Sequence, residues 1–215
     1  MLESKEIDPQ QVTDFSADMS IPFRKGIQEA FPTADLTFDK FHVMKLMNEA
    51  LDNVRRQEQK EESALKRSRY LWLSNECNLR KDQVEKLATL SSLNLKTARA
   101  YRIKLALQDV YARSADRNDA ERLLEDWHQW ASRSRIDAIR SFASTVRSNW
   151  TGILNYFNSR LTNAILESIN SIIQSAQNRA KGYRNVRTFI SIIYLLAGKL
   201  NLEFTRTQKP ATHSI

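Results

Sequence analysis

Glycine, proline and cysteine are scarce in this sequence. Its 215 residues include four glycines, four prolines and one cysteine, Cys77. So few chain-breaking residues disfavour disordered linkers, collagen-like repeats and β-sandwiches with many turns. One cysteine excludes a disulfide framework and a zinc module built from several cysteines. It suits a reducing compartment, and we expect a cytoplasmic protein.

Long hydrophobic runs are missing as well. The longest, residues 189–198, is too short to span a bilayer, and the acidic, polar start MLESKEIDPQ is unlike a signal peptide. The composition is 41% hydrophobic and 27% charged, a balance that can bury a core. These features predict a soluble, mostly helical protein with no membrane partner.

Positive charge gathers in the middle and at the C-terminal end of the chain. The formal net charge is +8, and it divides into −4 for residues 1–50, +5 for residues 51–110, +1 for residues 111–150 and +6 for residues 151–215. Basic surfaces attract phosphate backbones, so nucleic acid is the leading partner. Helix faces that are simply solvated are the alternative.

A strand, a helix and a second strand are predicted near the start of the chain. Residues 12–17 (VTDFSA) read as a short strand, and residues 34–38 alternate apolar and polar side chains as a strand does. Between them, residues 21–30 have helical spacing, with Pro22 in the first turn and Pro32 after the end. A connection that contains a helix makes the two strands parallel, with a right-handed crossover.

From residue 41 onward the apolar pattern is helical nearly to the end. Asp82 with Glu85 predicts the capped start of one helix, and Asn94 predicts the cap of the next. Apolar stripes predict further helices, and the last residues read as a frayed tail. These helices are expected within residues 43–54, 123–130, 136–157, 161–180 and 186–200.

Three acidic residues stand where chemistry is plausible. Asp18 and Asp39 follow the two strands, and ligands of open parallel sheets gather at the carboxyl ends of strands. Carboxylates there can hold Mg²⁺, or they can be helix N-caps. Glu167 is the only acid in residues 151–202 and shares a helix face with polar residues. It is either a metal ligand or an ordinary exposed glutamate.

Several segments of the chain can be compared with known families, namely residues 17–23 (ADMSIPF), 31–45 (FPTADLTFDKFHVMK), 65–73 (LKRSRYLWL), 150–157 (WTGILNYF), 161–171 (LTNAILESINS) and 179–185 (RAKGYRN). Together and in this order they resemble transposases of the ISL-three insertion-sequence family. The resemblance runs from about residue 12 to residue 200. Long motifs in a fixed order are more specific than any one of them alone.

The resemblance implies a fold that is mainly α with a small α/β part. This fold is a partial ribonuclease-H-like core of two parallel strands, interrupted by a helical insertion. We therefore expect residues 1–42 to be the remnant of that core and residues 43–150 to be the helical insertion. Residues 151–202 are expected to be C-terminal core helices that carry the glutamate, and residues 203–215 a tail.

The resemblance also implies a site. Asp18 and Glu167 match the second aspartate and the glutamate of a DDE catalytic triad, so both are expected to be catalytic and to hold part of a two-Mg²⁺ site. Asp39 and His42 match an Asp-x-x-His motif and are expected to be supporting residues. The expected DNA-binding residues are Arg179, Lys181, Arg184, Arg187 and Trp150, although helix-core packing is the alternative for Trp150.

One departure from the family pattern is large, because the strand that carries the family's first aspartate has no counterpart here. We therefore expect a truncated transposase fragment for DNA transposition that is inactive alone. The alternatives are a non-catalytic helical DNA-binding or dimerisation fragment, and a helical scaffold unrelated to DNA. Expected partners are DNA and either a second copy, as a homo-oligomer, or a full-length transposase.

Overall fold

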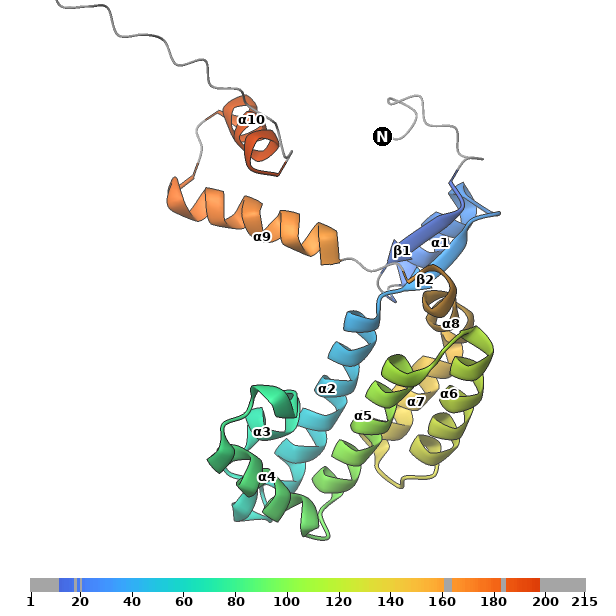
Figure 1. The fold of residues 1–215 in the computed structure, drawn as a ribbon, viewed down its shortest axis with the longest axis vertical. Coiled ribbons are helices and arrows are strands. Elements are labelled where there is room, and N and C mark those ends of the chain that lie inside the picture. Colours follow the sequence, from blue (N-terminus) through green and yellow to red (C-terminus); the bar gives the residue numbers. More distant parts are fainter. Residues whose placement is uncertain (1–11, 18, 20, 161–163, 183–184, 198–215) are drawn as a thin grey trace, which may run out of the picture. The chain divides into compact units, whose positions relative to one another are not determined.

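The computed structural model describes residues 12–17, 19, 21–160, 164–182 and 185–197 (Figure 1). The chain divides into two compact units, residues 1–163 and 164–215. The second unit contains α9 (Ala164–Arg179) and α10 (Val186–Ala197). The first contains β1 (Asp14–Ala17), α1 (Ile21–Ala30), β2 (Asp35–Phe38), α2 (Lys40–Glu58), η3 (Ser63–Leu65), α3 (Arg69–Leu73), η4 (Glu76–Asn78), α4 (Lys81–Ser92), α5 (Lys96–Arg113), α6 (Arg117–Ser132), α7 (Asp137–Ser148) and α8 (Trp150–Ser159).

The small sheet confirms the predicted strand–helix–strand arrangement. β1 and β2 pair in parallel, with Asp14 opposite Asp35 and Ala17 opposite Phe38. Helix α1 connects them, as the spacing of its apolar residues predicts. The fold is mainly helical with a small α/β part, as expected. Two strands do not by themselves define a ribonuclease-H-like core, which stays a prediction.

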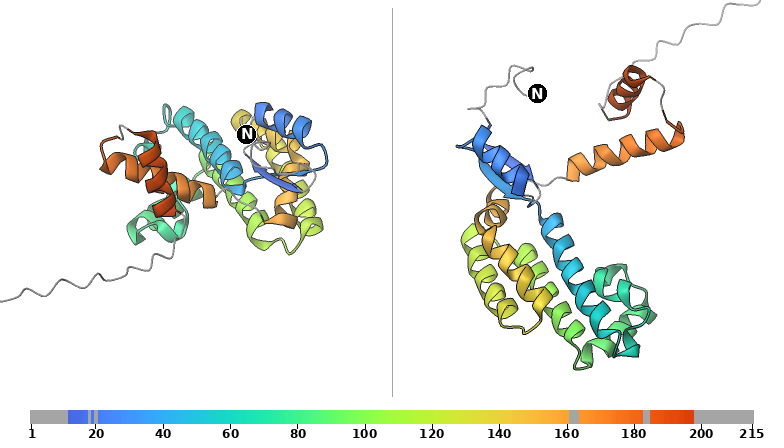
Figure 2. Two further views of the ribbon diagram at one scale, coloured as in Figure 1. Left: turned by 90° about the horizontal axis from the view of Figure 1, so that it is seen from above. Right: turned by 180° about the vertical axis from the view of Figure 1, so that it is seen from behind.

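A helical body follows the sheet and is built around α2 and α5, which lie side by side (Figures 1 and 2). Helix α7 also packs on α2, α6 packs on α5 and α7, and the short α3 and α4 complete the packing on α2 and α5. Val43, Met47 and Leu51 recur every fourth residue of α2, and all three are fully buried. The hydrophobic core therefore lies mainly in the helical body.

Helix α8 joins the helical body to the sheet. Residues 136–157, where at least one helix is predicted, lie in two helices, α7 and α8, and α8 packs against β2. A Cβ atom at Gly152 would overlap the ring of Phe38, so the missing side chain allows this close approach. The side-chain amide of Asn155 donates to the carbonyl oxygen of Leu36 at 3.1 Å. Strand β2 is thus held by a helix from much later in the chain.

The start of α4 differs from the prediction. The cap residue is Arg80, whose backbone N–H donates to the side chain of Gln83 at 3.0 Å. Asp82 lies in the first turn, where its carboxylate accepts from the Arg80 guanidinium at 3.1 Å and 3.2 Å. The predicted cap of Asp82 with Glu85 is therefore wrong, because the helix begins two residues earlier, at Lys81.

The start of α5 also differs from the prediction. Leu95, rather than Asn94, is the residue before the helix, and its side chain cannot cap. Glu58 of α2 takes that role, since its carboxylate accepts the backbone N–H groups of Lys96 and Thr97 at 2.7 Å and 2.8 Å. A cap that comes from another helix leaves no local sequence pattern.

In the second unit, α9 and α10 pack against each other. Gly182 follows α9 with a φ of 99°, a left-handed conformation that suits the end of a helix and that glycine adopts easily. Helix α10 leaves apolar side chains uncovered by α9, including Val186, Tyr194 and Leu196. Across the described residues, no helix is both long and apolar enough to cross a membrane.

Candidate functional site

Asp39 lies at the carboxyl edge of the sheet, directly after β2. Its backbone N–H donates to the carbonyl oxygen of Ala17 at 3.3 Å, so the two strands end side by side. Its carboxylate accepts the backbone N–H of Phe41 at 2.8 Å and caps α2, and the residue is only 2% exposed. The helix-cap interpretation is therefore right for Asp39. A supporting role in a site at this edge stays a prediction.

The two predicted catalytic acids are not visible as side chains. Asp18 lies outside the described residues. Glu167 belongs to α9, whose backbone is described, but its side chain is outside the described part. The approach of the Asp18 carboxylate to the Glu167 carboxylate therefore stays a prediction.

The described residues do not build a metal site by themselves. Among them, no three His, Cys, Asp or Glu side chains lie close enough together to hold a metal ion. Asp39 is buried and caps a helix, and His42 is half-buried one turn further along α2. Mg²⁺ prefers several oxygen ligands and keeps waters, which this pair does not supply. A Mg²⁺ site that involves Asp18 and Glu167 stays a prediction.

The predicted DNA-binding residues of the second unit lie around the connection between α9 and α10. Arg179 is in the last turn of α9, and Lys181 follows it with a φ of 50°. Arg187 is in the first turn of α10, and its backbone N–H donates to Asn185 at 2.9 Å. All three basic side chains are exposed, whereas Arg184 lies outside the described residues.

Trp150, the remaining predicted DNA-binding residue, already has protein contacts. Its ring lies under the Arg147 guanidinium, 4.6 Å from the ring centroid, and meets the edge of His128 at 6.0 Å. Its indole N–H donates to Glu121 at 3.4 Å. The residue is half-buried between α6 and α7, and these contacts favour the packing role over stacking on a base.

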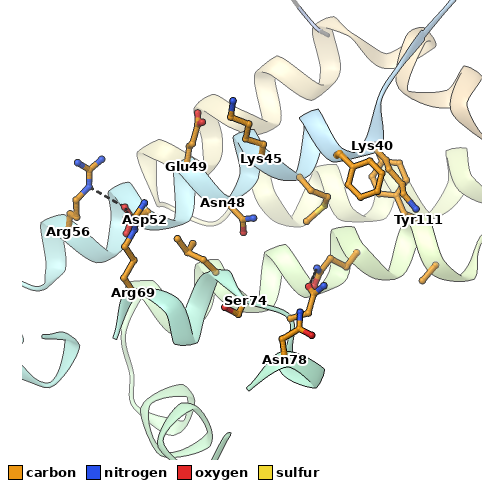
Figure 3. Close-up of a pocket in the computed structure, with 16 residues that line it drawn as sticks. Lys40, Lys45, Asn48, Glu49, Asp52, Arg56, Arg69, Ser74, Asn78 and Tyr111 are labelled. Carbon is orange, nitrogen blue, oxygen red and sulfur yellow. Dashed lines mark hydrogen bonds and ion pairs between the residues drawn. The ribbon is translucent and has the colours of Figure 1, made fainter. Parts of the chain in front are cut away.

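A groove that sequence reasoning missed runs along α2 from the carboxyl edge of the sheet (Figure 3). Its volume is about 940 Å³, and its walls come from α2, α3, α5 and residues 74–78. Lys40 and Lys45 supply positive charge along its α2 side. Asn48 Oδ1 and the Tyr111 hydroxyl are closed to water, and neither has a hydrogen-bond partner in the described part of the chain. Two buried polar atoms therefore lie in the residues of the groove wall without a hydrogen-bond partner among the described residues.

Tyr111 of α5 connects the groove with the edge of the sheet. Its ring stacks on Phe157 at 5.4 Å and meets the edge of Tyr156 at 5.5 Å. Burial raises the pKa of the Tyr111 hydroxyl, and the neighbouring Tyr156 and Asp39 raise it further. The hydroxyl therefore keeps its proton and remains a hydrogen-bond donor at physiological pH. A single tyrosine within a helical stripe gives no sequence signal for such a placement.

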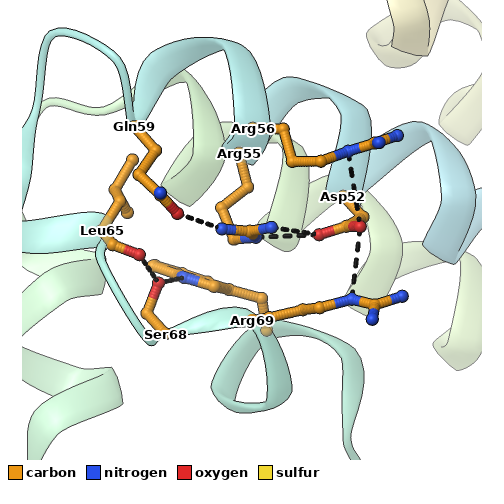
Figure 4. Close-up of polar contacts among 8 residues, drawn as sticks. Asp52, Arg55, Arg56, Gln59, Leu65, Ser68 and Arg69 are labelled. Atoms are coloured by element: carbon orange, nitrogen blue, oxygen red, sulfur yellow. Dashed lines mark hydrogen bonds and ion pairs between the residues drawn. The ribbon is translucent and has the colours of Figure 1, made fainter.

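Asp52 is the centre of an ionic network at the α2–α3 contact (Figure 4). The carboxylate lies 2.7 Å from Arg55, 3.6 Å from Arg56 and 3.3 Å from Arg69. The Asp52 and Arg55 side chains are only 11% and 7% exposed, whereas the other two arginines reach solvent. The spacing of Asp52 to Arg55 and Arg56 is visible in the sequence. The contribution of Arg69 from α3 is not.

Lys104 is a buried cation in the middle of α5. It is 1% exposed, and its Nζ donates to the carbonyl oxygens of Trp72 and Leu73 at 2.9 Å each. These carbonyls belong to the end of α3, where a helix has no partners of its own for them. Burial lowers the pKa of Lys104 from its usual 10.5 to about 8.

Comparison with known proteins places this fold in a family. Residues 1–193 match the family model of DDE transposases of the ISL3 type, described as transposase. The transposase for insertion sequence element IS1001 of Bordetella parapertussis is 30% identical over 190 residues, which cover 84% of this chain and 46% of that protein. The transposase for IS1557 of Mycobacterium tuberculosis is 27% identical over 217 aligned positions, which cover 87% and 48%. No solved structure shows significant similarity.

The chain belongs to the ISL3 family of transposases, because the family model matches nearly its whole length. It spans about half the length of the curated relatives that it matches. The sequence resemblance to this family is thus confirmed.

Proposed function

We propose that this chain forms part of the catalytic region of an insertion-sequence transposase and takes part in DNA cleavage and strand transfer. The family match over residues 1–193 carries this proposal. The parallel pairing of β1 with β2 supports it, since Ala17 and Asp39 meet at one edge of the sheet. This is the edge at which ligands of open parallel sheets gather.

Asp18 and Glu167 are the proposed catalytic acids. DDE transposases generally use a divalent metal, and a two-Mg²⁺ site supplies activation of the attacking oxygen and stabilisation of the leaving oxygen. In this chain the two carboxylates are the proposed ligands. Asp39 caps α2 at the same edge and fixes the direction in which the chain leaves β2. His42 in the first turn of α2 is the proposed second supporting residue.

The basic connection between α9 and α10 is proposed to hold DNA phosphates. Arg179, Lys181 and Arg187 are exposed there, and Arg184 belongs to the same stretch of sequence. Contacts of this kind position a DNA backbone without reading its sequence. They supply affinity that falls steeply as the salt concentration rises.

We further propose that the 215 residues bind DNA but do not cut it by themselves. A DDE triad needs three carboxylates, and the resemblance assigns only Asp18 and Glu167 to this chain. Loss of one ligand removes charge and geometry together, which Mg²⁺ tolerates poorly.

A nicking and binding assay with the purified chain tests both parts. Supercoiled plasmid is incubated with Mg²⁺ or Mn²⁺, beside the Glu167→Gln variant, and DNA binding is measured at increasing salt. We expect no nicking by either protein and equal, salt-dependent binding by both. Metal-dependent nicking that is lost in Glu167→Gln contradicts the inactivity. Absence of DNA binding even at low salt contradicts the role in transposition and favours a helical scaffold.

A non-catalytic DNA-binding or dimerisation fragment is the second candidate, and one observation favours it. Tyr194, Leu195 and Leu196 of α10 are more than half exposed, with values of 64%, 52% and 54%. Apolar exposure of this kind is typical of surfaces that pair with another chain. Sedimentation analysis of the chain alone, and mixed with a full-length family member, distinguishes a monomer from a homo-oligomer or a mixed complex.

A further inference from the structure

A basic pocket that differs from the groove along α2 lies where the N-terminal end of α5 meets the C-terminal end of α6. These helix ends lie at the end of the helical body remote from the sheet (Figure 1). We call it the α5–α6 arginine pocket. Its volume is about 390 Å³, within the range of small-ligand pockets. None of its described lining residues is acidic, and they include Arg99, Arg102, Trp130, Arg133 and Ser134.

The three arginines of this pocket have no counter-ion within the part of the chain that the structure describes. Every ion pair found there involves other basic residues. Arg99 and Arg102 come from one helix, and Arg133 follows another, so three like charges are brought together by the fold. Like charges placed close together repel each other. Such an arrangement is expected where a polyanion completes it.

Stability of the free chain does not explain the position of Arg99. Its Nε–H is closed to water and has no acceptor among the described residues, which costs free energy. It also lies in the first turn of α5, near the positive end of the helix dipole. The cation is therefore partly desolvated and electrostatically unfavourable as it stands. A phosphate at the open edge of its guanidinium would offset the positive charge that the helix dipole disfavours.

Trp130 adds an aromatic surface to the pocket. The residue is 46% exposed, whereas its neighbour Trp127 is 3% exposed and donates its indole N–H to Ile103. Single-strand binding sites combine two elements, exposed aromatic rings and basic side chains. Bases stack on the rings, and the phosphate backbone follows the positive charge. Bases within a duplex already stack on their neighbours, so Trp130 is suited to an unpaired base.

We propose that the α5–α6 arginine pocket binds a single-stranded segment of DNA. Arg99, Arg102 and Arg133 hold its phosphates through their planar guanidinium groups, and Trp130 stacks on one unpaired base. This inference rests on the proposed function, because it takes DNA as the substrate. It assigns a DNA contact to residues of the helical body, in addition to those proposed for Asp18, Glu167 and the α9–α10 connection.

Fluorescence anisotropy with a labelled single strand of about twelve nucleotides, and with the matching duplex, tests the pocket. The variants are the double substitution Arg99→Gln with Arg102→Gln, and Trp130→Ala. The matched controls are Arg56→Gln with Arg69→Gln, which removes equal charge from the Asp52 network, and Tyr70→Ala, which removes another exposed aromatic ring. Urea unfolding of each variant verifies that it is folded.

We expect the Arg99/Arg102 double variant to bind the single strand about tenfold more weakly, with a salt slope reduced by about 1–2. Trp130→Ala should weaken single-strand binding by about five- to a hundredfold, as loss of one stacked base does, and should leave duplex binding nearly unchanged. The controls should change single-strand affinity less than about threefold, because Arg56 and Arg69 are both paired with Asp52 and lie outside the pocket.

Three results overturn the inference. Equal losses of single-strand affinity in the Arg99/Arg102 double variant and in the Arg56/Arg69 control show that general electrostatic attraction, and not the pocket, holds the strand. Equal loss of single strand and duplex in Trp130→Ala shows that no base is stacked. Full competition by inorganic phosphate at equal phosphate concentration assigns the pocket to a free anion. If the unchanged chain binds DNA and the pocket variants bind the single strand with the same affinity, only this inference fails. If the unchanged chain binds no DNA, the proposed function fails as well.

Discussion

Two arginine clusters occupy the helical body, and only one of them is paired with a carboxylate among the described residues. At the α2–α3 contact, three guanidinium groups share the carboxylate of Asp52. In the α5–α6 arginine pocket, three guanidinium groups line one cavity without a described carboxylate partner. The same residue type therefore has two roles. Paired arginines join helices, and unpaired ones leave positive charge available to a ligand.

The first cluster belongs to a region in which charged groups are matched internally. Glu58 accepts the N–H groups at the start of α5 and the Thr97 hydroxyl. Lys104 donates to the carbonyls at the end of α3. Each group satisfies helix ends that lack partners of their own. We therefore expect substitutions here to lower stability, whereas substitutions in the arginine pocket should lower ligand affinity.

The largest effect is expected from Asp52→Asn. The change leaves Arg55, which is 6% exposed, as a buried cation without its carboxylate. Removal of one partner of a buried pair costs about 3–5 kcal/mol of unfolding free energy. Urea denaturation followed by circular dichroism measures it.

Asp82→Asn is the matched control for that prediction. It removes the partner of Arg80 from an ion pair in which both side chains are well exposed, at 69% and 73%. Exposed pairs contribute about 0–1 kcal/mol, so this control should be nearly neutral. Equal losses in the two variants would show that burial does not set the strength of the Asp52 network, and the contrast between the two clusters would disappear.

Local patterns explain how much of this fold could be predicted from the sequence. The strands near residues 12–17 and 34–38, their parallel pairing and the helix over residues 21–30 were all predictable, because apolar spacing and breaker residues act over a few positions. The same patterns placed the helical stripe of α2. Cap residues were less predictable, since Glu58 reaches the start of α5 from a different helix.

The candidate site was predictable only in part, for a related reason. Its position at the carboxyl edge followed from the order of strands, and the N-cap alternative for Asp39 followed from its place before a helix. The groove with Tyr111 and the α5–α6 arginine pocket each combine residues from separate helices. Neither leaves a motif in any one segment. The family motifs, together with the place of Asp18 after a strand and of Glu167 as the only acid in residues 151–202, point to these two residues, which stay predictions.

A smaller loss is expected from Glu58→Ala. The carboxylate accepts three hydrogen bonds at the start of α5, at 2.7–2.8 Å. Loss of a helix cap built from charged hydrogen bonds costs about 2 kcal/mol. Glu49→Ala removes an exposed glutamate from the same helix and should cost less than about 0.5 kcal/mol. Equal shifts of the urea unfolding midpoint in Glu58→Ala and Glu49→Ala would argue against capping of α5 by a residue of α2.

A pH-dependent contribution is expected from Lys104. Its pKa is lowered to about 8 in the folded chain, against 10.5 for an ordinary lysine. Between these values the unfolded chain binds more protons than the folded chain, so stability rises with pH. The unfolding free energy of the unchanged protein, relative to Lys104→Met, should rise by about 1 kcal/mol from about pH 7 to pH 9.

Urea titrations at several pH values measure this difference, and Lys81→Met supplies the background for loss of an exposed lysine. A difference that stays flat with pH would mean that the two α3 carbonyls hold Lys104 in its charged form despite burial. In that case Lys104 would stay charged while buried, as the paired Arg55 of the Asp52 network does.

The smallest effect on stability is expected from Arg99→Met in the arginine pocket. Methionine keeps much of the apolar stem of arginine and removes a guanidinium whose Nε–H is closed to water without an acceptor. It also removes a positive charge from the first turn of α5, where the helix dipole disfavours one. The unfolding free energy should therefore stay within about 0.5 kcal/mol of the unchanged protein, or rise. A loss above about 2 kcal/mol would show that Arg99 holds the helices together as Arg55 does, and the arginine pocket would then be a structural cluster like the first.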